Sequence, residues 1–105
     1  MGRIVISAFK PKEGKQNELK KIVLEHLPVL KSQNLVTDRS SIIMEAKDGT
    51  IIEVFEWVSE EAVENAHSNS EVMKIWDRFT EVCDYIPISS VEEAGFPFSH
   101  FSPVN

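Results

Sequence analysis

Histidine is the residue type in this chain best suited to chemistry, and it occurs at His26, His67 and His100. An imidazole titrates near neutral pH, so it can act as a general base or accept a hydrogen bond from a ligand hydroxyl. His67 lies near the apolar side of one predicted helical segment, at its end, and His26 lies on the apolar stripe of an earlier helix. We take His67 and His26 as candidate catalytic residues. Alternatively, each imidazole satisfies a backbone carbonyl, at a helix end for His67 and beside Pro28 for His26.

Aromatic residues form the second group of candidates, because their flat faces could hold an aromatic ligand and exclude water. Phe55 and Trp57 lie on a predicted strand, Trp76 lies on a helical stripe, and Tyr85 begins a predicted last strand. We take these residues as candidate substrate-binding residues. Each could instead pack in the core, and Tyr85 could simply lie at its rim.

Charged residues near the predicted sheet are further candidates. Arg39 could bind a substrate carboxylate or a developing enolate, or it could contact the neighbouring Asp38. Glu53 and Glu56 lie an odd number of positions apart on one predicted strand, so they must point to opposite faces. At least one of these carboxylates lies on a largely apolar surface, where it needs a partner and becomes a candidate base. The pattern does not decide which one is buried.

Composition and charge exclude several classes of function. The chain of 105 residues has a formal net charge of −6, which argues against nucleic-acid and anionic-membrane partners. No apolar run approaches the roughly 18 residues of a membrane span, and the first residues do not resemble a signal peptide. The single cysteine, Cys83, allows no disulfide within the chain, and the histidines have no metal-binding spacing. We expect a cytoplasmic protein without a metal site.

Strands and helices are predicted to alternate within a single domain, residues 1–105. Strands are expected over 3–9, over two runs within 41–58 that flank an Asp48-Gly49 turn, and over 85–91, where Pro87 indicates an edge. A helix over 15–32 is expected to be kinked at Pro28, and two further helical segments start at Ser59 and at Asn69 or Ser70. The order β-α-β-β-α-β is typical of a ferredoxin-like α+β fold with an antiparallel sheet, followed here by a C-terminal tail, residues 96–105.

The Asp48-Gly49 turn also predicts the hairpin register, and hence which side chains share a face. A two-residue turn places Ala46 opposite Ile51. One face then carries Ile42, Met44, Phe55 and Trp57, and the other carries Ile43, Ile52, Val54 and Val58. Two helices cover only one face of such a sheet, so a second apolar face needs another cover. We therefore predict a homodimer packed through the sheet face.

The strand end "EVFEW", the helix opening "SEEAVENAH" and the following "SNSEVMKIWDRF" resemble the antibiotic-biosynthesis-monooxygenase superfamily. The motif spans about residues 53–79, and the resemblance in topology covers nearly the whole chain. It implies a dimeric α+β barrel and a cofactor-independent oxygenase acting on a small hydroxylated aromatic or quinol. Ala66-His67 matches the Ala-His of the motif. A second histidine common at the next helix start is missing, because "SEVM" stands there.

The same superfamily has a haem-degrading branch, which uses a first-strand asparagine, a tryptophan before the second helix and a haem-ligating histidine ten residues later. Residues 3–9 contain no asparagine, and the other two positions hold His67 and Asp77. We therefore expect no haem and no other cofactor.

Two functions remain open, and whether the protein is an enzyme at all is not decided by the sequence. In the first, His67, His26 or a buried glutamate removes a phenolic proton before the ring reacts with dioxygen. In the second, a non-catalytic dimeric barrel binds a small apolar ligand. An RNA-binding module of the same element order is excluded by the glutamates of "IIEVFEWV".

Overall fold

One antiparallel sheet and three α-helices form the domain, which the computed structural model describes for residues 2–105. The strands are β1 (Arg3–Pro11), β2 (Ile42–Glu45), β3 (Ile51–Trp57), β4 (Cys83–Ile86) and β5 (Ser102–Pro103). The α-helices are α1 (Gln16–Ser32), α2 (Glu60–Ala66) and α3 (Ser70–Val82). The strands are hydrogen-bonded in the order β4-β1-β3-β2-β5, so β3 is central and β1 and β2 flank it.

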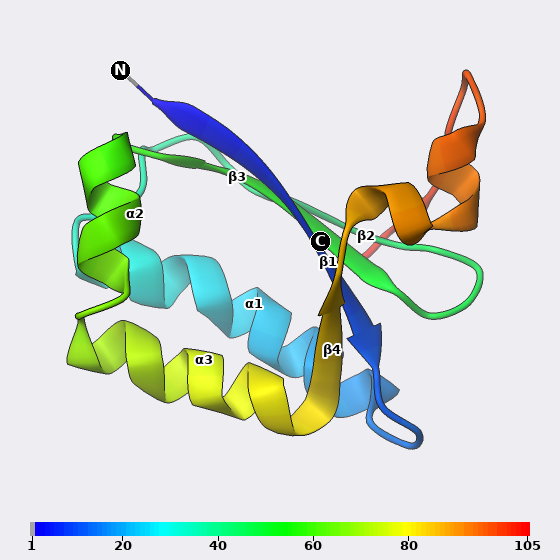
Figure 1. Ribbon diagram of the computed structural model, residues 1–105, viewed down its shortest axis with the longest axis horizontal. Coiled ribbons are helices and arrows are strands. Elements are labelled where there is room, and N and C mark those ends of the chain that lie inside the picture. Colours follow the sequence, from blue (N-terminus) through cyan, green and yellow to red (C-terminus); the bar gives the residue numbers. More distant parts are fainter. Residues whose placement is uncertain (1) are drawn as a thin grey trace.

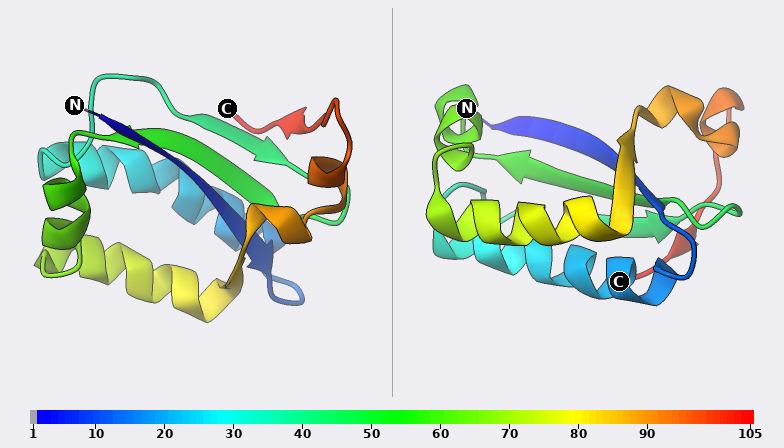
Figure 2. Two further views of the ribbon diagram at one scale, coloured as in Figure 1. Left: turned by 45° about the horizontal axis from the view of Figure 1, so that its top comes forward. Right: turned by 60° about the horizontal axis from the view of Figure 1, so that its bottom comes forward.

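The helices α1 and α3 lie together on one face of the sheet, and α2 lies at the end where β3 leaves it (Figures 1 and 2). Their starts follow from local chemistry. The Ser59 hydroxyl accepts a hydrogen bond from the Ala62 N–H, and the Asn69 side chain accepts from two N–H groups of the first turn of α3. The helix α1 continues through Pro28, and its apolar stripe is buried at Leu19, Ile22, Val23, Leu27 and Leu30.

The register of the hairpin between β2 and β3 differs by one residue from the prediction. Glu45, not Ala46, lies opposite Ile51. Because side chains alternate along a strand, this shift exchanges the two sides of β2 relative to β3. The inner, helix-covered face combines Ile43 and Glu45 with Ile51, Glu53, Phe55 and Trp57, and with Val5, Ser7 and Phe9 of β1. The outer face combines Ile42 and Met44 with Ile52, Val54 and Glu56, and with Ile4, Ile6 and Ala8.

The hairpin turn explains this shift, because it contains three residues, 47–49, and not two. The Gly49 N–H donates to the carbonyl of Ala46, and the Ala46 N–H donates to the carbonyl of Thr50. Gly49 has a φ of +92°, whereas Asp48 is not among the residues with positive φ. The predicted two-residue turn needs a positive φ at both positions, which is unfavourable for any residue with a Cβ.

The chain after β4 also departs from the prediction of a strand over 85–91. The strand β4 ends at Ile86, before Pro87, and two short 3₁₀ turns follow at Ile88–Ser90 and Glu92–Gly95. Proline has no N–H to donate to a ladder, so the strand stops there. The strand β4 lies at one edge of the sheet, beside β1.

The C-terminal segment covers part of the outer face and then pairs with the far edge of the sheet. Val91 and Phe101 pack with Ala8, Ala46 and Ile52. The segment continues as β5 beside β2.

The amide of Asn105 continues this pairing beyond β5. It accepts a hydrogen bond from the Ile43 N–H at 3.0 Å and donates to the Ser41 carbonyl at 3.0 Å. The tail therefore packs on the sheet of its own chain.

The rest of the outer face is an exposed apolar surface. Ile4, Ile6 and Ile42 are 61%, 52% and 58% exposed, and Val54 lies half-buried between them. Single exposed apolar residues are ordinary, but these side chains share one face of adjacent strands. Over residues 2–105, no helix has the combined length and apolar character needed to cross a membrane.

Candidate functional site

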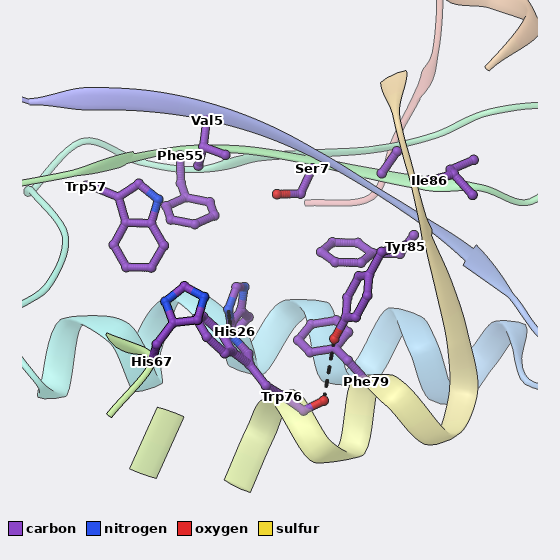
Figure 3. Close-up of a pocket in the computed structure, with 12 residues that line it drawn as sticks. Val5, Ser7, His26, Phe55, Trp57, His67, Trp76, Phe79, Tyr85 and Ile86 are labelled. Atoms are coloured by element: carbon purple, nitrogen blue, oxygen red, sulfur yellow. Dashed lines mark hydrogen bonds between the residues drawn. The ribbon is translucent and has the colours of Figure 1, made fainter. Parts of the chain in front are cut away.

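A cavity of about 390 Å³ lies between the inner face of the sheet and the helices, within the size range of small-molecule sites. Figure 3 shows its side chains directed from the strands on one side and from the helices on the other. It is lined by Val5, Ser7, Ala8, Phe9, His26, Phe55, Trp57, His67, Trp76, Phe79, Tyr85 and Ile86. The structure therefore brings both candidate histidines and all the candidate aromatic residues to one cavity.

The aromatic rings of the cavity pack mainly edge to face. Phe55 and Trp57 meet with ring centroids 5.2 Å apart, and Phe9 stacks on Phe79 at 4.8 Å. Phe55, Trp57 and Phe79 are buried, whereas Trp76 is half-buried. These rings are thus part of the core and also present apolar surface to the cavity, so the two interpretations of them are compatible.

His26 lies at the centre of a buried chain of hydrogen bonds. The Trp76 Nε1–H donates to His26 Nε2 at 3.0 Å, and His26 Nδ1 lies 2.8 Å from Glu53 Oε1. An indole N–H can only donate, so Nε2 is the unprotonated nitrogen and Nδ1 carries the proton that it donates to Glu53. The neutral His26 has no free lone pair, because Nε2 already accepts from Trp76. The alternative that His26 bonds a carbonyl near Pro28 is wrong, since its partners are the side chains of Glu53 and Trp76.

The sequence did not decide whether Glu53 or Glu56 is buried. In the structure, Glu53 is the buried carboxylate. Its side chain is 0% exposed, and its second oxygen, Oε2, has no hydrogen-bond partner within residues 2–105. Glu56 points to the outer face, where it accepts hydrogen bonds from Arg39 and Thr37. Those bonds lower the pKa of Glu56.

His67 is differently placed, because only one of its nitrogens is engaged. Nδ1 donates to the carbonyl of Val63 at 2.9 Å, and the ring packs edge-on against Trp76 with centroids 5.1 Å apart. The ring is exposed and lines the cavity between Trp57 and Trp76 (Figure 3). Nε2 has no partner in the described part of the chain, so the neutral ring offers a lone pair to a ligand. His67 thus closes its helix end and also lines the cavity.

Two hydrogen-bond donors in the cavity add to the predicted site: Ser7, which was not predicted, and the indole N–H of Trp57, which was predicted only as an aromatic surface. The Ser7 hydroxyl and the Trp57 indole N–H form no hydrogen bond to any residue from 2 to 105, yet both residues line the cavity. Ser7 points inward because it shares a face with Val5 and Phe9 of β1. Alternation along the first strand was the signal that could have identified it.

Tyr85 lies at the rim of the cavity, whereas Arg39 lies on the opposite side of the sheet. Tyr85 is 57% exposed, and its hydroxyl is 3.5 Å from the Trp76 carbonyl, a long hydrogen bond. Partial burial raises the pKa of Tyr85. Arg39 does not line the cavity, because its guanidinium pairs with Glu56 of the outer face at 3.1 Å.

Other chemistry-bearing groups lie outside the cavity. The Cys83 thiol is buried and donates to the Phe79 carbonyl, and burial raises the pKa of Cys83 to about 11. No group of three or more potential metal ligands occurs among residues 2–105. His100 lies in a separate hollow formed by the tail and the hairpin end.

The chain was compared with models of protein families, with curated proteins and with solved structures, and none of them matched. The direct evidence on function is the cavity and its side chains. Their chemistry combines an aromatic wall, one imidazole nitrogen able to accept a proton, and two unengaged donors.

Proposed function

We propose that the protein is a cofactor-independent monooxygenase-like enzyme acting on a small hydroxylated aromatic or quinol. One observation carries the proposal: His67 presents an unengaged Nε2 at a cavity whose walls are mainly aromatic and apolar. The flat ring of a substrate would lie against Trp57 and Trp76, with its ionisable hydroxyl directed to His67. His67 is the proposed base, because His26 has both nitrogens hydrogen-bonded.

The reaction needs a proton acceptor and dioxygen. His67 Nε2 takes the hydroxyl proton, and the electron-rich ring anion then reacts with dioxygen. For a quinol with a free ring C–H, one oxygen atom enters the ring and the other leaves as water, giving a hydroxyquinone. The substrate supplies all the electrons, so no reductant is required. The Ser7 hydroxyl and the Trp57 indole N–H would be available as hydrogen-bond donors to oxygens of the substrate.

The fold and the outer face support the related proposal of a ferredoxin-like homodimer. Without β5, the strand order β4-β1-β3-β2 is compatible with the ferredoxin-like arrangement, which the resemblance to the monooxygenase superfamily also implies. The exposed Ile4, Ile6 and Ile42 would pack against the same surface of a second copy. Sedimentation of the wild-type protein and of an Ile6→Lys variant tests this: we expect a dimer and a monomer, and a monomeric wild-type protein would contradict it.

Binding and turnover test the enzymatic proposal separately. Phenols and quinols are first screened for an increase in Tm at fixed protein concentration, where a ligand at 100 times its Kd adds about 2.7 kcal/mol. Oxygen uptake is then measured with the ligands that bind. We expect His67→Ala to lower kcat by about 10²- to 10⁴-fold while the variant still binds. The exposed His100 provides the control, His100→Ala, which should retain full activity.

A non-catalytic binding protein is the second candidate, and the exposure of His67 favours it. A base open to water at the end of a helix is less protected than most general bases, and its bond to Val63 also has a purely structural use. This candidate predicts saturable binding of an apolar aromatic without oxygen uptake. Unchanged turnover in His67→Ala would instead reject His67 as the base.

A further inference from the structure

Two hydrogen bonds link Glu53, His26 and Trp76, which lie on three different elements, and this network connects the core to the cavity. Glu53 lies on β3, His26 on α1 and Trp76 on α3. Of these three residues, Trp76 and His26 line the cavity and Glu53 does not. These two hydrogen bonds therefore connect the sheet to both long helices.

This hydrogen-bond network is not explained by stability alone. A buried carboxyl group with one partner retains much of its desolvation penalty, and Glu53 Oε2 has no partner among the described residues. The same contacts are, however, highly directional. The carboxylate fixes the proton on Nδ1, that tautomer exposes the Nε2 lone pair, and the lone pair orients the Trp76 indole.

The orientation of Trp76 matters for the cavity because its ring touches the proposed base. The indole lines the cavity and packs edge-on against His67, with 69° between the ring planes. His26 is itself held between the edges of Phe55 and Phe79, at centroid distances of 5.6 and 5.1 Å. A ring supported in this way is able to hold its neighbour in one orientation.

We propose that Glu53 and His26 are positioning residues, which fix the Trp76 indole and, through it, the His67 imidazole. The role of His67 as a base rests on the proposed function, but the positioning itself is a property of the ligand-free protein. The structure assigns the order Glu53 to His26 to Trp76 by hydrogen bonds, and Trp76 to His67 by ring packing.

Nuclear magnetic resonance of the ligand-free protein tests this assignment directly. The two tryptophans give two indole N–H signals, and Trp57→Phe identifies which signal belongs to Trp76. We expect the Trp76 signal to be shifted downfield and its proton to exchange slowly. In His26→Phe the signal should lose that shift, and exchange should become about tenfold faster. The ring signals of His67 should move in the same variant.

A conservative variant separates positioning from simple packing. In His26→Gln the side-chain amide can donate to Glu53 and its carbonyl can accept from the indole, so the Trp76 and His67 signals should stay close to wild type. Two results would overturn the inference. One is an unchanged Trp76 indole signal in a folded His26→Phe variant, and the other is a His67 signal that does not respond to it. Absence of ligand binding or turnover would instead count against the proposed function, since this experiment uses no ligand.

Discussion

Replacing His26 by phenylalanine should destabilise the domain strongly, because of the group that it leaves behind. Glu53 is fully buried, and in the described chain the His26 Nδ1–H is its hydrogen-bond donor. In His26→Phe the carboxyl group has no partner. Breaking a buried pair from one side typically costs about 3–5 kcal/mol. In a domain of this size, such a loss lowers the Tm by more than about 10 °C.

The double variant His26→Phe/Glu53→Leu makes this prediction specific to the buried carboxylate. Glu53→Leu alone leaves the imidazole N–H without an acceptor, at a cost of about 1–3 kcal/mol. The double variant leaves only the Trp76 indole N–H unpaired, on a half-buried side chain that lines the cavity. We expect it to lie within about 1 kcal/mol of the wild-type protein and well above His26→Phe.

Urea unfolding followed by circular dichroism measures these differences. All four proteins must be compared at one protein concentration, because association of the folded state would add to the apparent stability. Similar m values would show that the variants unfold from equally compact states. The reasoning is refuted if the costs of the two single changes add in the double variant, or if His26→Phe costs less than about 1 kcal/mol.

Three other predictions concern positions outside this network. Gly49→Ala should destabilise the protein by about 1–2 kcal/mol in thermal unfolding, because φ is +92° at this position. Gly95→Ala is the control and should be nearly neutral, because no atom lies within 4 Å of the added Cβ. Equal Tm values for the two variants would contradict this prediction. The Cys83 thiol, whose pKa burial raises to about 11, should react with a thiol reagent at pH 8 only after unfolding, and rapid labelling of the native protein would show that it is accessible. The lowered pKa of Glu56 stabilises the folded state above the ordinary glutamate pKa, and this contribution is lost as pH falls through the lower native value. Arg39→Met should therefore reduce the loss of stability in acid, and an identical pH profile of unfolding would reject the pairing.

The sequence predicted most of the elements, but not the end of β4, the short strand β5 or the pairing of one hairpin. Helical stripes and the caps at Ser59 and Asn69 depend on local spacing, which one chain displays directly. The Asp48-Gly49 dipeptide, in contrast, is compatible with two turns, since glycine supplies a positive φ in either. The three-residue turn avoids a positive φ at Asp48 and lets its carboxylate accept from the Thr50 N–H. The added turn residue changes which side chains of β2 share a face with Phe55 and Trp57 of β3.

The candidate site was predicted only in part, because some of its contacts join residues that are far apart in the sequence. Apolar periodicity placed Trp76 and His26 on the apolar stripes of their helices, and both line the cavity, but it did not decide which face of the sheet Trp57 shares with the helices. The bond between His26 and Glu53 joins residues 27 positions apart, and no local pattern contains it. Arg39 was associated with the site only by its chemistry, and its position on the outer face follows from the pairing with Glu56.

The strand β1 contributes to two surfaces that face in opposite directions. Val5, Ser7 and Phe9 line the cavity, while Ile4 and Ile6 belong to the outer face and alternate with them along β1. A displacement of this strand therefore moves both surfaces together. If a partner on the outer face alters the affinity of the cavity for a ligand, the ligand must alter the affinity for the partner by the same factor. Neighbouring residues of β1 belong to the two surfaces, so such reciprocal coupling needs to cross only one peptide bond.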